Sequence, residues 1–502
     1  MARYSKFAYN SGTKYGTSAA SNTLSVALEI DWDNDGVWNG SSEDEWLQSI
    51  QIKRGRRYMI QEEGEDFEDV IVGNALFVLN NNDGRYSTDN EDSALYPNVL
   101  PGRVCKLRIK NNSDGELYSV FYGYIKDIRP FYEGFNKVRI TVDDGMQFLK
   151  QRSITTTLYT DEKVEDLFTY ILDDYAGWTD GYSIGNDEET IPYWWEYDKI
   201  KALTSLRKLT HAYVGKMFID ASGQFVYYSR NYDPSSSANI TSTDIQRNFG
   251  ASQPWDFIRN KIEVIAHPRK LNNDVTIWEL NDTPLIEAGE SLEIWADYSY
   301  DGKTVPAIDV ISPVATTDYT MNAQADGGGS NLTANFTVTP TKFASSTKLE
   351  IENTGGTDGY ITFMQLRGDA LSEYPTTIKR EDSSSISTYG ERAFTLDYDS
   401  VQEIDIAIDF ANYVRTLLAS PKKWLDITII GKPDKQLLEL FDLVSVIVNE
   451  YISGDYWVAY LEHDWNIQNA HNIITRMRLE QKDETAFWTF TAQVGDSTRF
   501  TY

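Results

Sequence analysis

The segment ALFVLNNNDGRYSTDN, residues 75–90, carries the strongest fold signal in this chain of 502 residues. It begins with a short apolar run, residues 75–79, and continues into the cluster NNNDG, residues 80–84. A short apolar run that ends in Asn, Asp and Gly predicts a β-strand followed by a turn, because these residues tolerate the backbone angles of tight turns. We therefore interpret residues 80–84 as a turn and not as a binding loop. Similar runs and turns recur from residue 25 to about residue 154, which predicts an all-β domain.

Downstream of this region, three segments have apolar residues at the spacing of amphipathic helices. They are residues 161–175, 198–213 and 400–419. Thr160 is the expected N-cap of the first helix, because a Thr hydroxyl can accept a hydrogen bond from a free backbone N–H at a helix start. Gly177 is its expected stop, because Gly accommodates the left-handed residue that often follows a helix.

The chain is long enough to need several hydrophobic cores. The segment KMFIDASGQFVYYSR, residues 216–230, follows the second helix and has the pattern of a β-hairpin, which favours a small α/β unit. Residues 267–370 are rich in Thr, Ser, Gly and Asn and contain strand patterns without a helical period, which favours a β-sandwich. The sequence therefore predicts a mainly β protein in four parts: an all-β domain (1–155), an α/β domain (156–265), an inserted β-sandwich (266–375) and a helix followed by strands (376–502).

Acidic residues outnumber basic ones by 76 to 46, which gives a formal net charge of -30. This sign disfavours stable binding to nucleic-acid phosphates or to anionic lipids. Hydrophobic residues make up 41% of the chain, so it has enough apolar surface to fold despite its charge. The residues after Met1 form no apolar run, so we expect no secretory signal or membrane anchor, and synthesis in a cytoplasm. Cys105 is the only cysteine, which excludes intramolecular disulfides and predicts a small buried residue on a strand.

Three phrases that occur in order carry a family resemblance: LEIDWDNDGVW (28–38), the segment quoted first, and ALYPNVLPGRVCKLRI (94–109). They resemble the N-terminal region of minor tail and tail-hub proteins of long-tailed bacteriophages. Residues 79–87 match the family form L-x-N-x-D-G-R-Y-S, and residues 95–104 match L-Y-x-N-x-L-P-G-R-V. Later segments such as NTGGTDGYITFMQLRGDAL are also similar, so the resemblance covers nearly the whole chain. The chain departs from the family at residues 441–444, which read FDLV where relatives often carry Gly-Asp-x-Val.

The resemblance implies a baseplate hub with tube-protein-like β-barrels formed by the first and last parts of the chain. It implies a homotrimer, because two barrels in each of three chains match the six-fold symmetry of a tail tube. The expected role is structural: the hub caps the tail tube, adapts the six-fold tube to a three-fold tip, and mounts fibres or a spike. The expected location is the tail tip of a virion. Expected partners are a tail-tube or distal tail protein, the tape-measure protein and fibre or spike proteins, while DNA passes through the channel during ejection.

The loop DWDNDGVWN, residues 31–39, places Asp31, Asp33 and Asp35 at alternate positions before a glycine. This spacing is typical of calcium loops, where alternate carboxylates converge on the ion. Such loops end in an acidic residue at the twelfth position, which is Ser42 here. Two interpretations stay open: the three aspartates share a calcium ion, or the loop is a solvated acidic hairpin tip.

A basic run contains Lys53, Arg54, Arg56 and Arg57 and precedes an acidic stretch at residues 62–69. In a chain this acidic, a basic run is a candidate contact with neighbouring tail proteins. The alternative is a solvated strand and turn. On the first interpretation, replacing Arg54 and Arg56 by Glu should impair assembly and leave the isolated chain folded.

Trp194 and Trp195 lie in the aromatic segment PYWWEYD. Adjacent tryptophans can anchor a neighbouring subunit or occupy a core, and they can also form a platform for sugars. We list both residues as candidates for a partner interface, with the core and sugar binding as the alternatives.

The sequence contains none of the common motifs of catalysis. Its four histidines form no H-E-x-x-H pattern, and neither a G-x-S-x-G segment nor a phosphate-binding loop occurs. Adjacent carboxylates such as Asp143 and Asp144 are expected by chance in a chain this acidic. We therefore expect a non-enzymatic protein that needs no cofactor apart from the possible calcium ion. Two rival functions stay open: a receptor-binding module for a host surface glycan, and a tail enzyme that degrades the cell wall.

Overall fold

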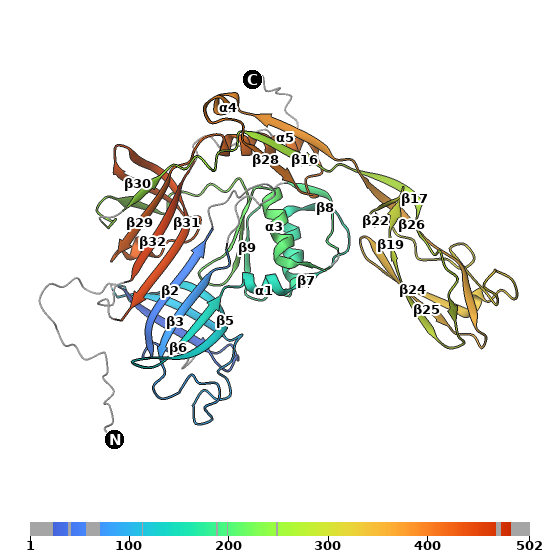
Figure 1. The fold of residues 1–502 in the computed structure, drawn as a ribbon, viewed down its shortest axis with the longest axis horizontal. Helices are drawn as coiled ribbons and strands as arrows, with labels where there is room; N and C mark the ends of the chain where they lie inside the picture. Colours follow the sequence, from blue (N-terminus) through green and yellow to red (C-terminus); the bar gives the residue numbers. More distant parts are fainter. Residues whose placement is uncertain are drawn as a thin grey trace, which may run out of the picture.

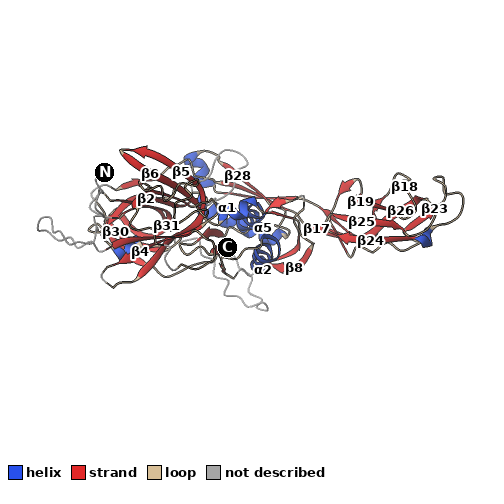
Figure 2. Cartoon of the chain, turned by 90° about the horizontal axis from the view of Figure 1, so that it is seen from below, coloured by secondary structure: helices blue, strands red, loops and turns tan. Residues whose placement is uncertain are grey.

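The computed structural model describes residues 24–38, 42–56, 71–112, 114–186, 189–197, 199–246, 249–467 and 473–482. The chain is built mainly from β-strands, as the sequence predicts. Two groups of strands lie side by side, a region with helices adjoins them, and a β-sandwich extends away from this body (Figure 1). The view from below places the sandwich at the far end of the long axis (Figure 2).

Two lobes of strands share one 12-stranded sheet, in the order β1-β4-β5-β6-β3-β2-β31-β32-β29-β15, with β30 paired to β31 and β14 to β30. The N-terminal lobe contains β1 (Leu24–Asp31), β2 (Leu47–Gly55), β3 (Asn74–Asn80), β4 (Val104–Asn111), β5 (Leu117–Glu133) and β6 (Phe135–Asp143). The C-terminal lobe contains β14 (Ala238–Thr241), β15 (Gly250–Ser252), β29 (Trp424–Ile430), β30 (Leu443–Asn449), β31 (Ile452–Asn466) and β32 (Ile474–Gln481). The lobes join where β2 pairs antiparallel with β31, with Ile52 opposite His463.

The segment around β3 shows why the chain forms these strands. Phe77 and Leu79 are fully buried and alternate with partly exposed neighbours, as expected for a strand with one face on the core. The predicted turn at residues 80–84 is confirmed, because Gly84 has a φ of 71°, which a side chain would disfavour. Tyr86 follows the turn and is fully buried in the core of the N-terminal lobe.

The region beside the lobes contains helices and short strands. Its elements are α1 (Met146–Gln151), β7 (Ser153–Ile154), β8 (Tyr159–Lys163), α2 (Val164–Tyr170), the π-helix η1 (Ile171–Ala176), β9 (Tyr182–Ile184), β10 (Thr190–Trp194), β11 (Ile200–Lys201), α3 (Ala202–Ala212), β12 (Lys216–Ile219) and β13 (Phe225–Tyr228). The predicted hairpin is confirmed, because Met217 pairs with Tyr227 across β12 and β13.

The first predicted helix starts later than expected. Residues 159–163 pair with β10 as strand β8, so the helix begins at Val164 and not at residue 161. The prediction that Thr160 is its N-cap is therefore wrong, and Lys163 occupies that position. The predicted stop is confirmed, since Gly177 follows η1 with a left-handed φ of 65°.

A small sheet and a long helix form the layer above this region in Figure 1. The sheet order is β27-β16-β28, and helix α5 packs against β16. The elements are β16 (Lys261–Ala266), β27 (Thr376–Glu381), α4 (Ser383–Tyr389), β28 (Ala393–Asp397), α5 (Ile404–Leu418) and α6 (Pro433–Gln436).

The β-sandwich is inserted between two paired strands of that layer. Its elements are β17 (Arg269–Glu279), β18 (Leu285–Ile286), β19 (Ser291–Asp297), β20 (Ser299–Tyr300), β21 (Lys303–Thr304), β22 (Ala307–Ile308), β23 (Tyr319–Asn322), η2 (Thr333–Asn335), β24 (Phe336–Lys342), β25 (Ser346–Asn353) and β26 (Gly359–Glu373). The chain leaves the body from β16 into β17 and returns from β26 into β27. We call these two connections, residues 266–269 and 373–376, the neck.

Buried apolar side chains form three clusters in the described residues. One fills the N-terminal lobe and includes Cys105, which is fully buried on β4 as expected. A second fills the sandwich. The largest extends from Met146 to Leu479, so one core joins residues of the predicted parts 156–265 and 376–502. No helix in the described ranges is both long and apolar enough to span a membrane.

Candidate functional site

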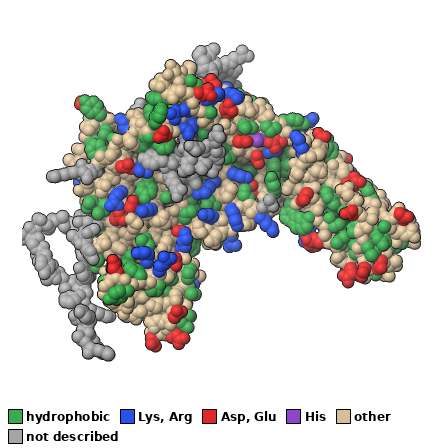
Figure 3. Space-filling view, viewed as in Figure 1, with side chains coloured by type: hydrophobic (Ala, Val, Ile, Leu, Met, Phe, Trp, Pro, Cys, Tyr) green, Lys and Arg blue, Asp and Glu red, His purple; other side chains and the backbone are tan. Residues whose placement is uncertain are grey.

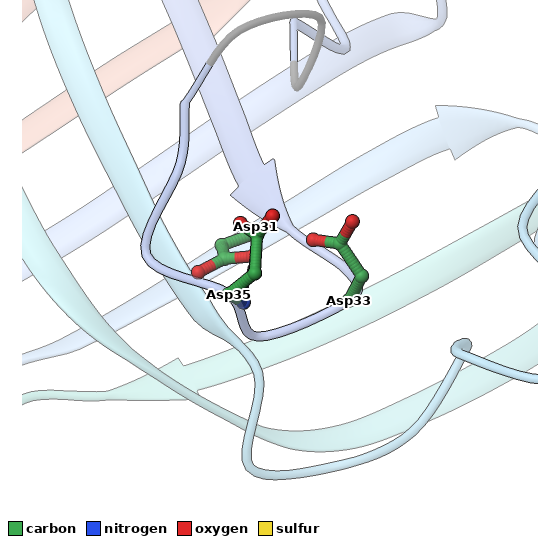
Figure 4. A group of neighbouring side chains, drawn as sticks. All are labelled: Asp31, Asp33 and Asp35. Atoms are coloured by element: carbon green, nitrogen blue, oxygen red, sulfur yellow. Dashed lines mark hydrogen bonds between the residues drawn. The ribbon is translucent and has the colours of Figure 1, made fainter.

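The acidic loop after β1 brings its three aspartates together (Figure 4). One carboxylate oxygen from each of Asp31, Asp33 and Asp35 lies within 4.8 Å of the others. Asp31 is buried and accepts hydrogen bonds from the backbone N–H groups of Asp35 at 3.3 Å and Gly36 at 2.9 Å. The pKa of Asp33 is raised by its hydrogen bond with Asp31, by desolvation and by the nearby charge of Asp35. This crowding fits a shared cation, although the backbone already holds one of the three carboxylates.

The acidic residues after Ser42 do not complete this cluster. Glu43 is buried and accepts hydrogen bonds from the indole N–H of Trp32 at 2.8 Å and from the hydroxyl of Tyr86. Asp44 accepts the backbone N–H of Leu28 at 2.6 Å, and burial raises its pKa. Both acids therefore have roles inside the N-terminal lobe, and a cation at the loop would depend on Asp31, Asp33 and Asp35.

Two residues of the basic run, Arg54 on β2 and Arg56 just after it, turn inward. The side chain of Arg54 is 4% exposed, donates to the backbone oxygen of Ile219 at 2.8 Å, and forms an ion pair with Glu439 at 2.6 Å. The other carboxylate oxygen of Glu439 accepts the backbone N–H of Ala221 at 2.8 Å. Arg54 and Glu439 thus connect β2 to the β12–β13 hairpin and to the segment before β30. We call this pair the lobe clamp.

Arg56 is enclosed in the same way. Its guanidinium pairs with Glu480 on β32 and lies 5.7 Å from the ring centroid of Trp424. Glu480 also pairs with Lys422 at 3.0 Å. The prediction that Arg54 and Arg56 contact a partner protein is therefore wrong, because both side chains are buried within the chain.

The other two basic candidates have different outcomes. Lys53 is partly exposed on β2, so its contact with a partner stays a prediction. Arg57 lies outside the described residues.

The two tryptophans of PYWWEYD have different environments, since Trp194 is the last residue of β10 and Trp195 lies just beyond the strand. Trp194 is 5% exposed, belongs to the largest core and lies 5.9 Å from the ring of Tyr159. The partner-interface prediction is therefore wrong for Trp194, which takes the core position that was the alternative. Trp195 is partly exposed, and the guanidinium of Arg269 lies 5.1 Å from its ring centroid.

Trp195 lines a cleft of about 450 Å³ beside the neck. Its walls are the residues around β10, part of α3, and the end of β28 with the residues that follow it. The aromatic and charged members are Tyr193, Trp194, Trp195, Tyr197, Tyr398, Glu196, Asp397, Asp399 and Lys208. Burial raises the pKa of Glu196, whose carboxylate lies 3.7 Å from the Lys208 ammonium. Aromatic rings beside carboxylates suit a sugar or a basic side chain of a partner protein.

A cluster of acidic and basic side chains at the neck borders this cleft. His267 lies between two carboxylates: Nδ1 contacts Glu373, and Nε2 is 2.7 Å from Asp397. Arg269 also donates to Glu373 at 2.7 Å. These contacts fix the base of the sandwich to β28 of the body.

The sequence did not identify the acidic partners of these buried groups. Glu439 is the single carboxylate in the apolar run LLELF, whereas Glu480 lies in the mixed segment MRLEQ on β32 and is not marked in this way. A single carboxylate inside an apolar run signals a buried acid that needs a cationic partner. That signal was present, but it does not say which arginine is the partner.

Comparison with known proteins concerns the fold. The chain is similar to the crystal structure of the tail protein from Neisseria meningitidis MC58, with a TM-score of 0.50 and 11% identity, over 91% of this chain and 96% of that one. The chain has the fold of a phage tail protein. Two prophage proteins are also similar to it: the 43 kDa tail protein of prophage MuSo2 from Shewanella oneidensis (TM-score 0.49, 13% identity, 91% and 98% covered) and prophage tail protein gp18 from Listeria monocytogenes EGD-e (0.43, 9%, 92% and 95%).

No protein-family model matches the sequence, and no curated protein matches it. The tail-protein fold is therefore recognised through the arrangement of elements and not through sequence identity. It agrees with the fold that the resemblance in residues 28–109 implies.

Proposed function

We propose that this chain is a structural hub at the tip of a phage or prophage tail. The observation that carries the proposal is the 12-stranded sheet, which has six strands from the N-terminal lobe and six from the C-terminal lobe on either side of the β2–β31 pair. A chain with two fused β-lobes presents two tube-like surfaces in a fixed relation. The similarity to the Neisseria tail protein over most of both chains supports the same conclusion.

On this proposal three copies form a ring of six lobes. A homotrimer of two-lobed subunits matches a six-fold tail tube on one side and offers three-fold symmetry on the other. The hub caps the tube, contacts a tail-tube or distal tail protein and the tape-measure protein, and mounts fibres or a spike. Its place is the tail tip of the virion, and its role is assembly and not catalysis.

The acidic charge fits a protein on the path of DNA. A formal charge of -30 per chain gives 3 × -30 = -90 for a trimer. A channel lined with Lys and Arg would release counterions and hold the genome, whereas an acidic wall repels phosphate. We expect a net negative inner rim, with basic side chains concentrated at contacts between proteins.

The proposal is tested by the mass of the full chain, alone and mixed with the tail-tube protein of the same virus, measured by light scattering or native mass spectrometry. A trimer is expected, either alone or on the tube protein. A reconstruction of the tail should show three copies at the tip with an acidic bore. One copy or six equivalent copies would contradict the proposal, and a bore lined with unpaired Lys and Arg would contradict the charge argument.

A further inference from the structure

The sandwich carries an exposed aromatic ring that is held in a fixed position. Trp295 on β19 is 53% exposed. Its indole stacks on Phe343, with ring centroids 5.6 Å apart and planes 18° from parallel. The indole N–H donates to Glu293 at 3.0 Å. Because the stack and the hydrogen bond fix the ring, little conformational entropy remains to be lost when a ligand covers it.

The register of the sheet surrounds this ring with polar groups. In the sheet β19-β25-β24, Trp295 lies opposite Lys348, which lies opposite Thr341. The next outward-facing row consists of Glu293, Glu350 and Thr339. These side chains stand on one face, because residues two apart on a strand share a face and paired residues lie side by side. The face therefore combines one apolar ring with hydroxyl, carboxylate and ammonium groups.

The ion pairs on this face keep its polar groups ordered. Lys348 contacts Glu350 at 2.6 Å and Glu293 at 3.6 Å, and its hydrogen bond with Glu350 raises its pKa. One ammonium group thus sets the positions of two carboxylates, one of which also holds Trp295. The carboxylate oxygens accept hydrogen bonds, and the threonine hydroxyls both donate and accept them.

The side chains on this face favour one class of ligand. A pyranose ring has C–H groups on one face, which carry partial positive charge and pack on the negative face of an aromatic ring, and hydroxyl groups at its edge. The exposed or partly exposed charged residues of the sheet are four acids, Glu293, Asp297, Glu350 and Glu352, and two bases, Lys348 and Lys342 at the end of β24. Like charges would repel phosphate-bearing or carboxylate-bearing glycans. The face is suited to uncharged sugars.

Trp295 is 53% exposed and Glu293 and Glu350 are also exposed, so this face is accessible in the isolated chain. The sandwich lies at the far end of the long axis and meets the body at the neck (Figures 1 and 2). The visible face of the molecule has acidic side chains at the outer end of the sandwich (Figure 3). A ligand on the sandwich therefore need not compete with assembly through the two lobes.

We propose that the outer face of the sheet β19-β25-β24 binds an uncharged glycan, composed of hexoses or N-acetylhexosamines, with one sugar ring stacked on Trp295. Glu293, Glu350, Thr339 and Thr341 hydrogen-bond its hydroxyls. This site adds glycan recognition to the structural role and does not depend on it.

The test uses the full chain on an array that contains neutral oligosaccharides, including N-acetylglucosamine tetramers, and acidic ones, including sialic acid trimers. Neutral oligosaccharides should bind and acidic ones should not. Calorimetry with the best neutral oligosaccharide should show that Trp295→Ala raises Kd at least tenfold, which is about 1.4 kcal/mol. Trp295→Phe keeps an aromatic ring and should retain part of the affinity.

Trp255 supplies a matched control. It is 57% exposed, similar to Trp295, but it lies between β15 and β16, outside the sandwich and therefore outside the proposed site. Trp255→Ala should leave Kd unchanged within twofold, and both alanine variants should melt like the wild type. Absence of binding to every neutral oligosaccharide, equal losses in Trp255→Ala and Trp295→Ala, or equal binding of acidic oligosaccharides would overturn the inference.

Discussion

Replacing Arg54 by Met should destabilise the isolated chain, because it removes the cationic half of the lobe clamp and keeps much of the volume. The backbone oxygen of Ile219 would lose its donor and Glu439 its counter-charge. Removing one partner of a buried ion pair costs about 3–5 kcal/mol. The side chain of Glu439 is 26% exposed, so water would partly solvate it, and we expect a loss near the lower end, about 3 kcal/mol.

The assay is urea unfolding of the full chain followed by tryptophan fluorescence, together with hydrogen exchange of the Ala221 amide. That amide donates to Glu439, so loss of the clamp should accelerate its exchange. Lys53→Met on the same strand is the control, and its change should stay within about 0.5 kcal/mol. A double-mutant cycle with Glu439→Gln should show coupling between the two sites. An Arg54→Met variant with the wild-type midpoint and unchanged Ala221 exchange would refute the role of the clamp.

Three further outcomes follow from buried groups and from the acidic loop. Burial, followed by the charge of Arg54, lowers the pKa of His463 to about 4, below its ordinary value of 6.5. Between these values the unfolded chain binds more protons than the folded chain, so stability should fall as pH decreases from about 6.5 to 4. Over that range, the difference in unfolding free energy between wild type and His463→Gln should shrink by up to about 3 kcal/mol. A difference that stays constant with pH would disprove this prediction. Asp33→Ala should lower the melting temperature more in calcium than in chelator if the loop binds calcium, and equal losses would favour the solvated tip. Trp194→Ala should cost about 3–5 kcal/mol in urea unfolding, whereas Trp195→Ala should cost much less; similar costs would contradict the assigned core position.

Local patterns were predictable where one face of an element meets a core. The strand at residues 75–79, the turn at residues 80–84 and the stop at Gly177 depend on a few neighbouring residues, and all three were confirmed. The predicted start of the first helix was wrong because Thr160 belongs to strand β8, which pairs with β10. The sequence pattern of that segment holds no information about its partner strand.

The burial of Arg54 and Arg56 was not predictable for the same reason. The expected environment of Arg54 and Arg56 was either a contact with a neighbouring tail protein or a solvated strand and turn. Strand β2 instead has β3 on one side and β31 on the other, so it lies at the centre of the sheet. The pairing of Ile52 with His463 joins residues far apart in the chain. The spacing of apolar residues within a short segment does not predict such a distant contact. Only Glu439, the single acid in the apolar run LLELF, indicated that a buried cation was needed.

The neck has a consequence for how the protein can change over time. Ala266 lies directly opposite Thr376 in the pair β16–β27, so the insert begins and ends on neighbouring antiparallel strands. A short turn can close such a pair, because the two chain ends are only one strand spacing apart. The sandwich is therefore an insertion that recombination at these two positions can delete, or replace with another domain, without changing the strand order of the body. Such exchange would let a lineage alter the surface it presents while the lobes, and the contacts they make, are inherited unchanged.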